Sequence, residues 1–341
     1  QVMISMPIKP CIAPVALAIL VAGSVFNTPA LAQQDKLKLA KKLANPVAAL
    51  ISVPFQLNDD RNIGLDDAGE RWTLNIQPVV PFEINPDWNI ISRTIFPVIS
   101  QEDVFPGAGK QSGIGDTVQS VFFSPRAPMA DGWIWGAGPV LLLPTGSDTL
   151  LTGDQWGAGP TGVILKQRGP WTFGGLGNHI ASFAGDDARA DVNATFLQPF
   201  LSYTTPKAST FAINSKSTYN WETEQWSAPI NGVVSKVTKI GSQLVSVGVG
   251  LRYWVDTPES GPEGMGFWLK ATLLFPRGMD SPGASALRTD DQEWEENQQI
   301  ESEALAPFPE AIVPEPSTRS SAPPADPRPP WTPIEILSLA V

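Results

Sequence analysis

Apolar and polar residues alternate along most of the chain between residues 48 and 276. In the stretch QLVSVGVGLRYWVD (243–256), every second position from 245 to 255 carries a large apolar residue. The positions between them carry Ser, Gly, Arg and Trp. Since successive side chains of an extended chain point to opposite sides, this pattern predicts a β-strand with two different faces. Segments of strand character, separated by turn residues, are predicted at 48–57, 71–84, 88–100, 114–124, 133–144, 157–167, 171–183, 193–205, 209–221, 227–240, 243–255 and 265–276.

Most of these predicted strands are longer than the roughly five or six residues of strands in soluble proteins. They match instead the roughly 9–11 residues that cross a bilayer at a tilt. Their polar faces carry mainly Ser, Thr, Asn, Gln and Gly with a few basic residues, which suits the wall of a wet lumen. We therefore predict an all-β fold, a transmembrane antiparallel up-and-down β-barrel of about 12 strands.

The connections between predicted strands differ in length and charge according to whether they follow an even-numbered or an odd-numbered strand. Those after even-numbered strands are mostly short, whereas those after odd-numbered strands are longer on average and hold most of the acidic residues. Barrels of the outer membrane combine short periplasmic turns with longer external loops in this way. With the first strand starting in the periplasm, the acids, Asp59 and Asp60 among them, are expected in the outer loops.

Tryptophan also falls near the ends of the predicted strands. Amphipathic rings at the depth of lipid headgroups form the aromatic girdle of membrane barrels. We expect this girdle to consist of Trp88, Trp133, Trp135 and Trp171 at the periplasmic rim and Trp72, Trp156, Trp221 and Trp226 at the outer rim.

The two ends of the chain differ from its middle. Residues 1–32 have the basic, apolar and small-residue regions of a signal peptide, and they contain the only cysteine, Cys11. Residues 33–47 are predicted to form a periplasmic leader or a short helix, with a plug in the lumen as the alternative. Residues 48–276 form the predicted barrel. Residues 277–341, rich in Pro, Ser and acids, are expected to be mostly disordered.

Five segments together resemble one protein family. They are NPVAALISVPFQLNDD (45–60), GIGDTVQSVFFSP (113–125), GPVLLLPTG (138–146), GAGPTGVIL (157–165) and LKATLLFP (269–276). These segments are similar to bacterial outer-membrane proteins named for meta-pathway phenol degradation and often labelled transporters. The resemblance implies an outer-membrane barrel that passes aromatic or other small organic compounds, and it supplies no binding residues. Such proteins usually end after the LLFP counterpart, so Phe275 is here the candidate for recognition by the barrel-insertion machinery.

The alternation of inward and outward positions along each strand places a set of polar and charged residues toward the predicted lumen. Basic side chains in a low-dielectric lumen favour anions, although they can equally balance Glu83 and the acids of the loops. The strand 227–240 fits either register, so Lys236 and Lys239 are left unassigned. The lumen-facing candidates are Asn75, Gln77, Glu83, Arg93, Gln198, Lys216, Arg252 and Lys270.

Catalysis finds little support in the sequence. His179 is the only histidine, and Ser182, three residues later, is expected to point to the opposite side of its strand. The chain also lacks a G-x-S-x-G nucleophile motif. We predict that the protein is not an enzyme and uses no cofactor and no metal.

These observations lead to an expected function. We expect a channel in the Gram-negative bacterial outer membrane for diffusion or uptake of small organic solutes, aromatic or anionic ones among them. The expected partners are outer-membrane lipid and lipopolysaccharide, the barrel-insertion machinery and a small-molecule solute. The net charge of −11 argues against nucleic acid. Two alternatives stay open: a sealed outer-membrane barrel that acts as adhesin or scaffold, and a secreted soluble β-sandwich that binds a ligand.

Overall fold

The computed structural model describes residues 30–276. The predicted tail lies outside these residues, as does the predicted signal peptide apart from residues 30–32, which lie in the first turn of helix α1 (Ala30–Leu43). No helix within the described range is long and apolar enough to cross a membrane. The strands are β1 (Ile51–Ile63), β2 (Gly69–Ile76), β3 (Val79–Glu83), β4 (Trp88–Glu102), β5 (Lys110–Ile114), β6 (Thr117–Pro125), β7 (Trp133–Leu143), β8 (Gln155–Arg168), β9 (Trp171–Gly185), β10 (Asn193–Thr204), β11 (Ser209–Ser215), β12 (Ser217–Asn220), β13 (Gln225–Ile240), β14 (Gln243–Asp256) and β15 (Met265–Phe275).

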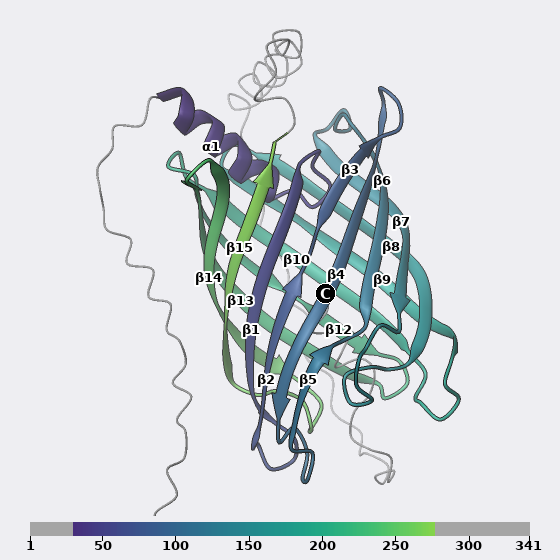
Figure 1. Cartoon of the computed structure of the whole chain (residues 1–341). Coiled ribbons are helices and arrows are strands. Elements are labelled where there is room, and N and C mark those ends of the chain that lie inside the picture. Colours follow the sequence, from purple (N-terminus) through teal and green to yellow (C-terminus); the bar gives the residue numbers. More distant parts are fainter. Residues whose placement is uncertain (1–29, 277–341) are drawn as a thin grey trace, which may run out of the picture.

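The strands form one antiparallel sheet that closes on itself. The first strand, β1, pairs with the last, β15, from Ile51 opposite Phe275 to Asp59 opposite Phe267, and with β2 on its other side. Figure 1 shows the resulting barrel. Three positions around it are each shared by two shorter strands, β2 with β3, β5 with β6 and β11 with β12. The predicted barrel of 12 strands is confirmed, and its closed sheet is not the β-sandwich of the second alternative.

Backbone hydrogen bonds continue across the interruptions between the paired short strands. At Pro78, which has no N–H to donate, the neighbouring Gln77 N donates to Pro54 O at 2.9 Å, and Thr94 N donates to Pro78 O at 3.1 Å. Between β5 and β6, Gly115 N donates to Pro97 O at 2.9 Å. These bonds matter because a backbone group without a partner costs several kcal/mol in a hydrocarbon environment, on the order of 2–7.

The two faces of β14 meet different environments, as the alternation predicts. Val249 and Tyr253 point outward and are 55% and 53% exposed, whereas Arg252 and Trp254, which flank Tyr253, are buried inside the barrel. Pairing also settles the register of β13. Asn231 lies opposite Arg252 and therefore faces inward, so Lys236, five residues on, faces outward.

Seven of the eight tryptophans of the predicted girdle occupy outward-facing positions of their strands, and Trp221 lies exposed in the connection directly after β12. At one end of the barrel, Trp88 and Trp135 pack edge to face with ring centroids 5.9 Å apart. At the other end, Trp72 packs in the same manner on Phe267 at 5.6 Å. Each contact thus spans one intervening strand, β6 in the first case and β1 in the second. The position of the rings at headgroup depth stays a prediction.

The two ends of the barrel differ in their connections. The end where β1 starts and β15 finishes, here called the terminal end, has the turns 84–87, 126–132, 169–170, 205–208 and 241–242. The opposite end, the loop end, has the longer connections 64–68, 103–109, 144–154, 186–192, 221–224 and 257–264. One part of the expected distribution of acids is wrong: Asp59 and Asp60 lie within β1, which continues to Ile63, and not in an outer loop.

The outward face of β14 provides a test of a lipid environment. Val249 lies near the middle of the strand and Tyr253 near its loop end, and the two are exposed to nearly the same extent. We expect Val249→Arg to reduce the free energy of unfolding in lipid vesicles by about 2–4 kcal/mol and Tyr253→Arg by about 0–1 kcal/mol, because the cost of a charge falls toward the interface. Denaturant titration followed by tryptophan fluorescence measures both. Equal effects of the two substitutions would contradict a hydrocarbon-facing wall.

Candidate functional site: the barrel lumen

One half of the inner wall is apolar. Most of its side chains come from inward positions of β4 and β6–β10, joined by Val47 after α1 and Val192 before β10, and they are almost completely buried because they pack against one another. Barrels of about eight strands are filled by side chains in this way, and larger ones leave space. The cluster consists of Val47, Ile91, Ile95, Val118, Phe122, Val140, Leu142, Val163, Leu165, Leu176, Ile180, Val192, Ala194 and Phe196.

The other half of the wall is polar and is organised around one buried ion pair. Arg252 Nη1 donates to both carboxylate oxygens of Asp60, at 2.8 Å and 3.0 Å, and the two side chains are 5% and 0% exposed. The remaining guanidinium donors bond to Asn231 Oδ1 at 3.1 Å and to Asn58 Oδ1 at 3.2 Å. Trp254 Nε1 donates to Asp60 Oδ1 at 3.1 Å. This set joins β1, β13 and β14 inside the barrel, and each of the three guanidinium nitrogens of Arg252 has an acceptor.

Helix α1 lies across the terminal end of the barrel (Figure 1). Its residues Leu39 and Ala40 pack against Ala208 and Val237 of the barrel rim. Gln167 Nε2 donates to Lys41 O at 3.0 Å, which fixes the last turn of the helix. The helix ends shortly before Pro46, and the following segment enters the barrel, where Val47 joins the apolar cluster of the lumen.

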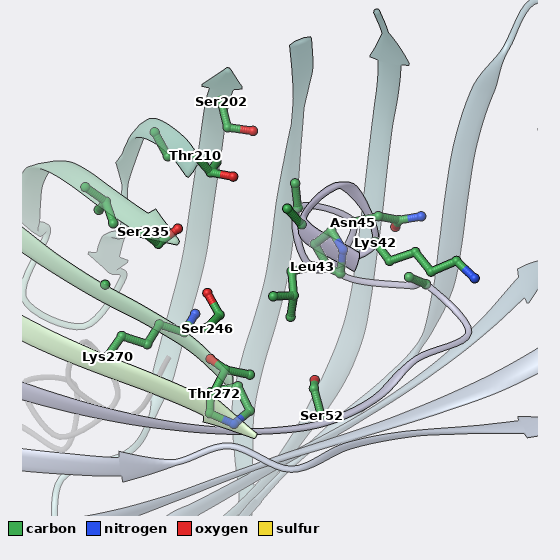
Figure 2. Close-up of a pocket in the computed structure, with 18 of the residues that line it drawn as sticks. Lys42, Leu43, Asn45, Ser52, Ser202, Thr210, Ser235, Ser246, Lys270 and Thr272 are labelled. Atoms are coloured by element: carbon green, nitrogen blue, oxygen red, sulfur yellow. The ribbon is translucent and has the colours of Figure 1, made fainter. Parts of the chain in front are cut away.

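A cavity of about 260 Å³ lies inside the barrel next to this segment. Its lining includes Leu43 at the end of α1, residues 44–46, Gln77, and inward positions of β1, β3, β4, β9–β11 and β13–β15. Figure 2 shows a ring of hydroxyl side chains around it, with Lys270 extending beside Ser246. The Lys42 side chain points away from Lys270 in the same view. None of the residues that line the cavity is acidic.

The structure brings half of the sequence-predicted lumen residues to this cavity. Gln77, Arg93, Gln198 and Lys270 line it. Asn75, Lys216 and Arg252 are buried in the barrel interior outside the cavity lining. Glu83 differs: it lies exposed at the terminal rim, where its Oε2 is 3.6 Å from Arg126 Nη1. Their roles in a pore stay predictions.

Sequence reasoning missed several lumen residues. Asp60 was assigned to a loop because the first strand was predicted to end at residue 57. Trp254 and Trp268 were not proposed for the lumen, although parity with Arg252 and Lys270 places both on the inward face. Both tryptophans can be placed in the lumen from the sequence if the alternation of faces is applied to aromatic residues as well as to polar ones.

His179 and Ser182 make separate contacts. His179 Nδ1 lies 3.0 Å from Thr195 Oγ1, and Ser182 Oγ donates to Asp191 Oδ1 at 3.0 Å. Within residues 30–276, no three His, Cys, Asp or Glu side chains come together as a metal site.

Comparison with known proteins supports the barrel fold. No family model matches the sequence, and no curated protein matches it significantly. The chain is similar to the COG4313 outer membrane channel from Pseudomonas putida F1, with a TM-score of 0.53, 16% identity, and coverage of 66% of this chain and 94% of that one. The NanC porin gives a TM-score of 0.40 at 10% identity over 66% and 99% of the two chains.

Another similar structure corrects one prediction. It is the outer membrane phospholipase A from Escherichia coli, with a TM-score of 0.40, 9% identity, and coverage of 70% of this chain and 98% of that one. Its name identifies an enzyme, so the prediction that this protein is not an enzyme is withdrawn. The fold leaves catalytic activity undecided.

At 16% identity, the similarity to the COG4313 channel shows the fold alone, a closed antiparallel β-barrel. The narrower resemblance to phenol-degradation proteins has no matching family model.

The buried ion pair yields a stability prediction. Asp60→Ala leaves the Arg252 guanidinium buried without its carboxylate, and we expect a loss of about 3–5 kcal/mol in the free energy of unfolding. As a control, Arg126→Ala breaks the exposed pair with Glu83 and should cost less than about 1 kcal/mol. Denaturant titration in detergent micelles measures both. Similar losses in the two variants would show that the Arg252 network does not stabilise the barrel.

Helix α1 yields a second prediction, which separates the plug from the leader. A mature chain that begins at Asn45 lacks the helix but keeps Val47 in the apolar cluster. We expect its single-channel conductance in planar bilayers to rise several-fold, because the terminal end of the lumen is then uncovered. Gln34→Ala, at an exposed position of α1, is the control and should leave the conductance unchanged. An unchanged conductance in the shortened chain would place α1 outside the conduction path.

Proposed function

We propose that this protein is a bacterial outer-membrane channel for small organic solutes, with anionic and aromatic compounds favoured. The observation that carries the proposal is the cavity inside the closed barrel, which is bordered by Arg93 and Lys270 and by no acidic side chain. A cavity lining without acidic residues and with fixed positive charges favours the entry of anions.

The outside of the barrel supports this proposal. Large apolar side chains such as Val249, Leu251 and Val255 are more than half exposed on the outer wall, which suits contact with lipid. Tryptophans near both rims suit the interfaces. The acidic residues remaining at the loop end, Asp186 and Asp187 among them, suit divalent cations that bridge lipopolysaccharide phosphates.

The inside of the barrel supports organic solutes over simple ions. An apolar half-wall offers a hydrated ion no charge or hydrogen bond, whereas it can contact the apolar part of an organic molecule that crosses the lumen. The resemblance of five segments to phenol-degradation proteins agrees with aromatic solutes. We therefore favour a narrow channel that passes organic molecules with a polar or anionic group.

Ion selectivity tests the proposal. We expect conductance in planar bilayers with a preference for anions, and we expect Lys270→Gln combined with Arg93→Gln to reduce that preference at least two-fold, because the two substitutions remove the positive charges beside the cavity. Lys236→Gln removes a charge of the outward face and should leave the preference unchanged.

Two outcomes would contradict the proposal. Cation selectivity of the unmodified protein would show that Arg93 and Lys270 do not set the field of the lumen. Absence of conductance in both the full mature chain and the chain that begins at Asn45 would favour the sealed adhesin or scaffold.

A further inference from the structure

The polar side of the cavity offers hydrogen-bond donors and positive charge. Lys270 has no hydrogen-bond acceptor and no acidic partner among residues 30–276. Arg93 makes one long hydrogen bond, from Nη2 to Gln77 Oε1 at 3.4 Å. Both side chains line the same cavity. Arg252, in contrast, is neutralised by Asp60 within the same barrel, so the uncompensated charge gathers at the cavity.

Two buried N–H donors of the cavity lining also lack acceptors. Trp268 is 6% exposed, and its indole Nε1 makes no hydrogen bond. Gln77 is 5% exposed, and its Nε2 makes none either. Buried donors are normally paired, and an unpaired one costs about as much as desolvating the group. Both donors belong to a cavity that contains no carboxylate, so an anionic acceptor is the group that the cavity lacks.

Part of the cavity lining is apolar. Leu176 of β9 and Phe200 of β10 belong to it, together with Leu43 at the end of α1, which is labelled in Figure 2. The volume of about 260 Å³ corresponds to about nine molecules of liquid water at roughly 30 Å³ each. A molecule with about nine non-hydrogen atoms, such as a benzene ring with one carboxylate, therefore fits.

We propose that the cavity is a binding site for small organic monocarboxylates that carry an aromatic or compact apolar body. The inference rests on the proposed channel function and names the solute class of that same lumen. The carboxylate lies between Lys270 and Arg93 and accepts from Trp268 Nε1 or Gln77 Nε2 after a small side-chain rotation. The apolar body packs on Phe200, Leu176 and Leu43.

The chemistry of the lining separates this class from others. A cation would meet Arg93 and Lys270 without any acidic partner. A neutral aromatic molecule would fill the apolar side but leave both charges and both N–H donors as they are. Inorganic phosphate would satisfy the donors but leave Phe200 and Leu176 in contact with water. Only a molecule with both parts uses the whole site.

Binding of benzoate to the full mature chain in detergent micelles tests the inference. Isothermal titration calorimetry should give saturable one-site binding, with benzyl alcohol and inorganic phosphate each at least ten-fold weaker. Lys270→Gln should weaken benzoate binding at least ten-fold, and Trp268→Phe, which keeps an aromatic ring but removes the N–H, should weaken it several-fold.

The control variant is Lys236→Gln, whose side chain faces outward from the same barrel, and it should bind benzoate like the unmodified protein. Each variant is first checked for a folded barrel by its faster migration when unheated on a denaturing gel. If a folded Lys270→Gln variant binds benzoate normally, or if benzyl alcohol binds as tightly as benzoate, the carboxylate site is overturned. Equal binding of phosphate would overturn the apolar part of the site.

The binding measurement tests the carboxylate site and the conductance measurement tests the channel, so the two proposals can be contradicted separately. Anion-selective conductance without benzoate binding would leave the channel in place and overturn this inference. Benzoate binding without conductance would leave the site in place and contradict the channel.

Discussion

Pairing of the first strand with the last is the constraint on which the rest of the structure depends. A sheet that faces hydrocarbon cannot leave an edge, because each unpaired backbone N–H or C=O there lacks water as an alternative partner. The ladder from Ile51–Phe275 to Asp59–Phe267 removes that edge. It also fixes the face that each residue presents, because a shift of one residue would turn every side chain to the other side. Lys270 and Arg252 face the lumen for this reason.

Closure then creates the problem of filling the interior. The barrel is wider than barrels whose interior is completely filled by side chains. The two halves of its inner wall are packed in different ways. Bulky apolar side chains from β4 and β6–β10 meet one another, assisted by Val47 from the segment after α1. Glycine allows close approach on this side: a Cβ at Gly159 would lie 1.8 Å from His179 O. The polar half is held by hydrogen bonds instead, and the cavity lies where the two halves and α1 meet.

The strands could be predicted from the sequence because apolar and polar residues alternate wherever the two faces of a strand meet different environments. The ends of the strands could not be predicted, because near the rims the inward and outward side chains no longer meet two clearly different environments. Asp60 shows the difference: an acid at the end of a strand is read as part of a loop, and only its pairing with Arg252, 192 residues away, reveals a buried position. The register of β13 was open for a similar reason, since VVSKV offers apolar residues on both faces, and its neighbour β14 decides it. Glu83 follows the predicted parity but lies so near the rim that it contacts Arg126 instead of the lumen.

Arg252 and Lys270 illustrate why parity alone cannot assign function. Both are basic, both lie on inward positions of adjacent strands, and the sequence gives no reason to separate them. The difference comes from their neighbours in space: Arg252 meets Asp60, Asn58 and Asn231, which use its donors and neutralise its charge. A cation whose charge and donors are fully used within the protein stabilises the fold and offers little to a solute. Lys270 lies opposite Gln56 and Gly248, neither of which can neutralise it, and beside open space. Its charge is therefore available to whatever enters the barrel, and the solute preference of the lumen is expected to depend on it.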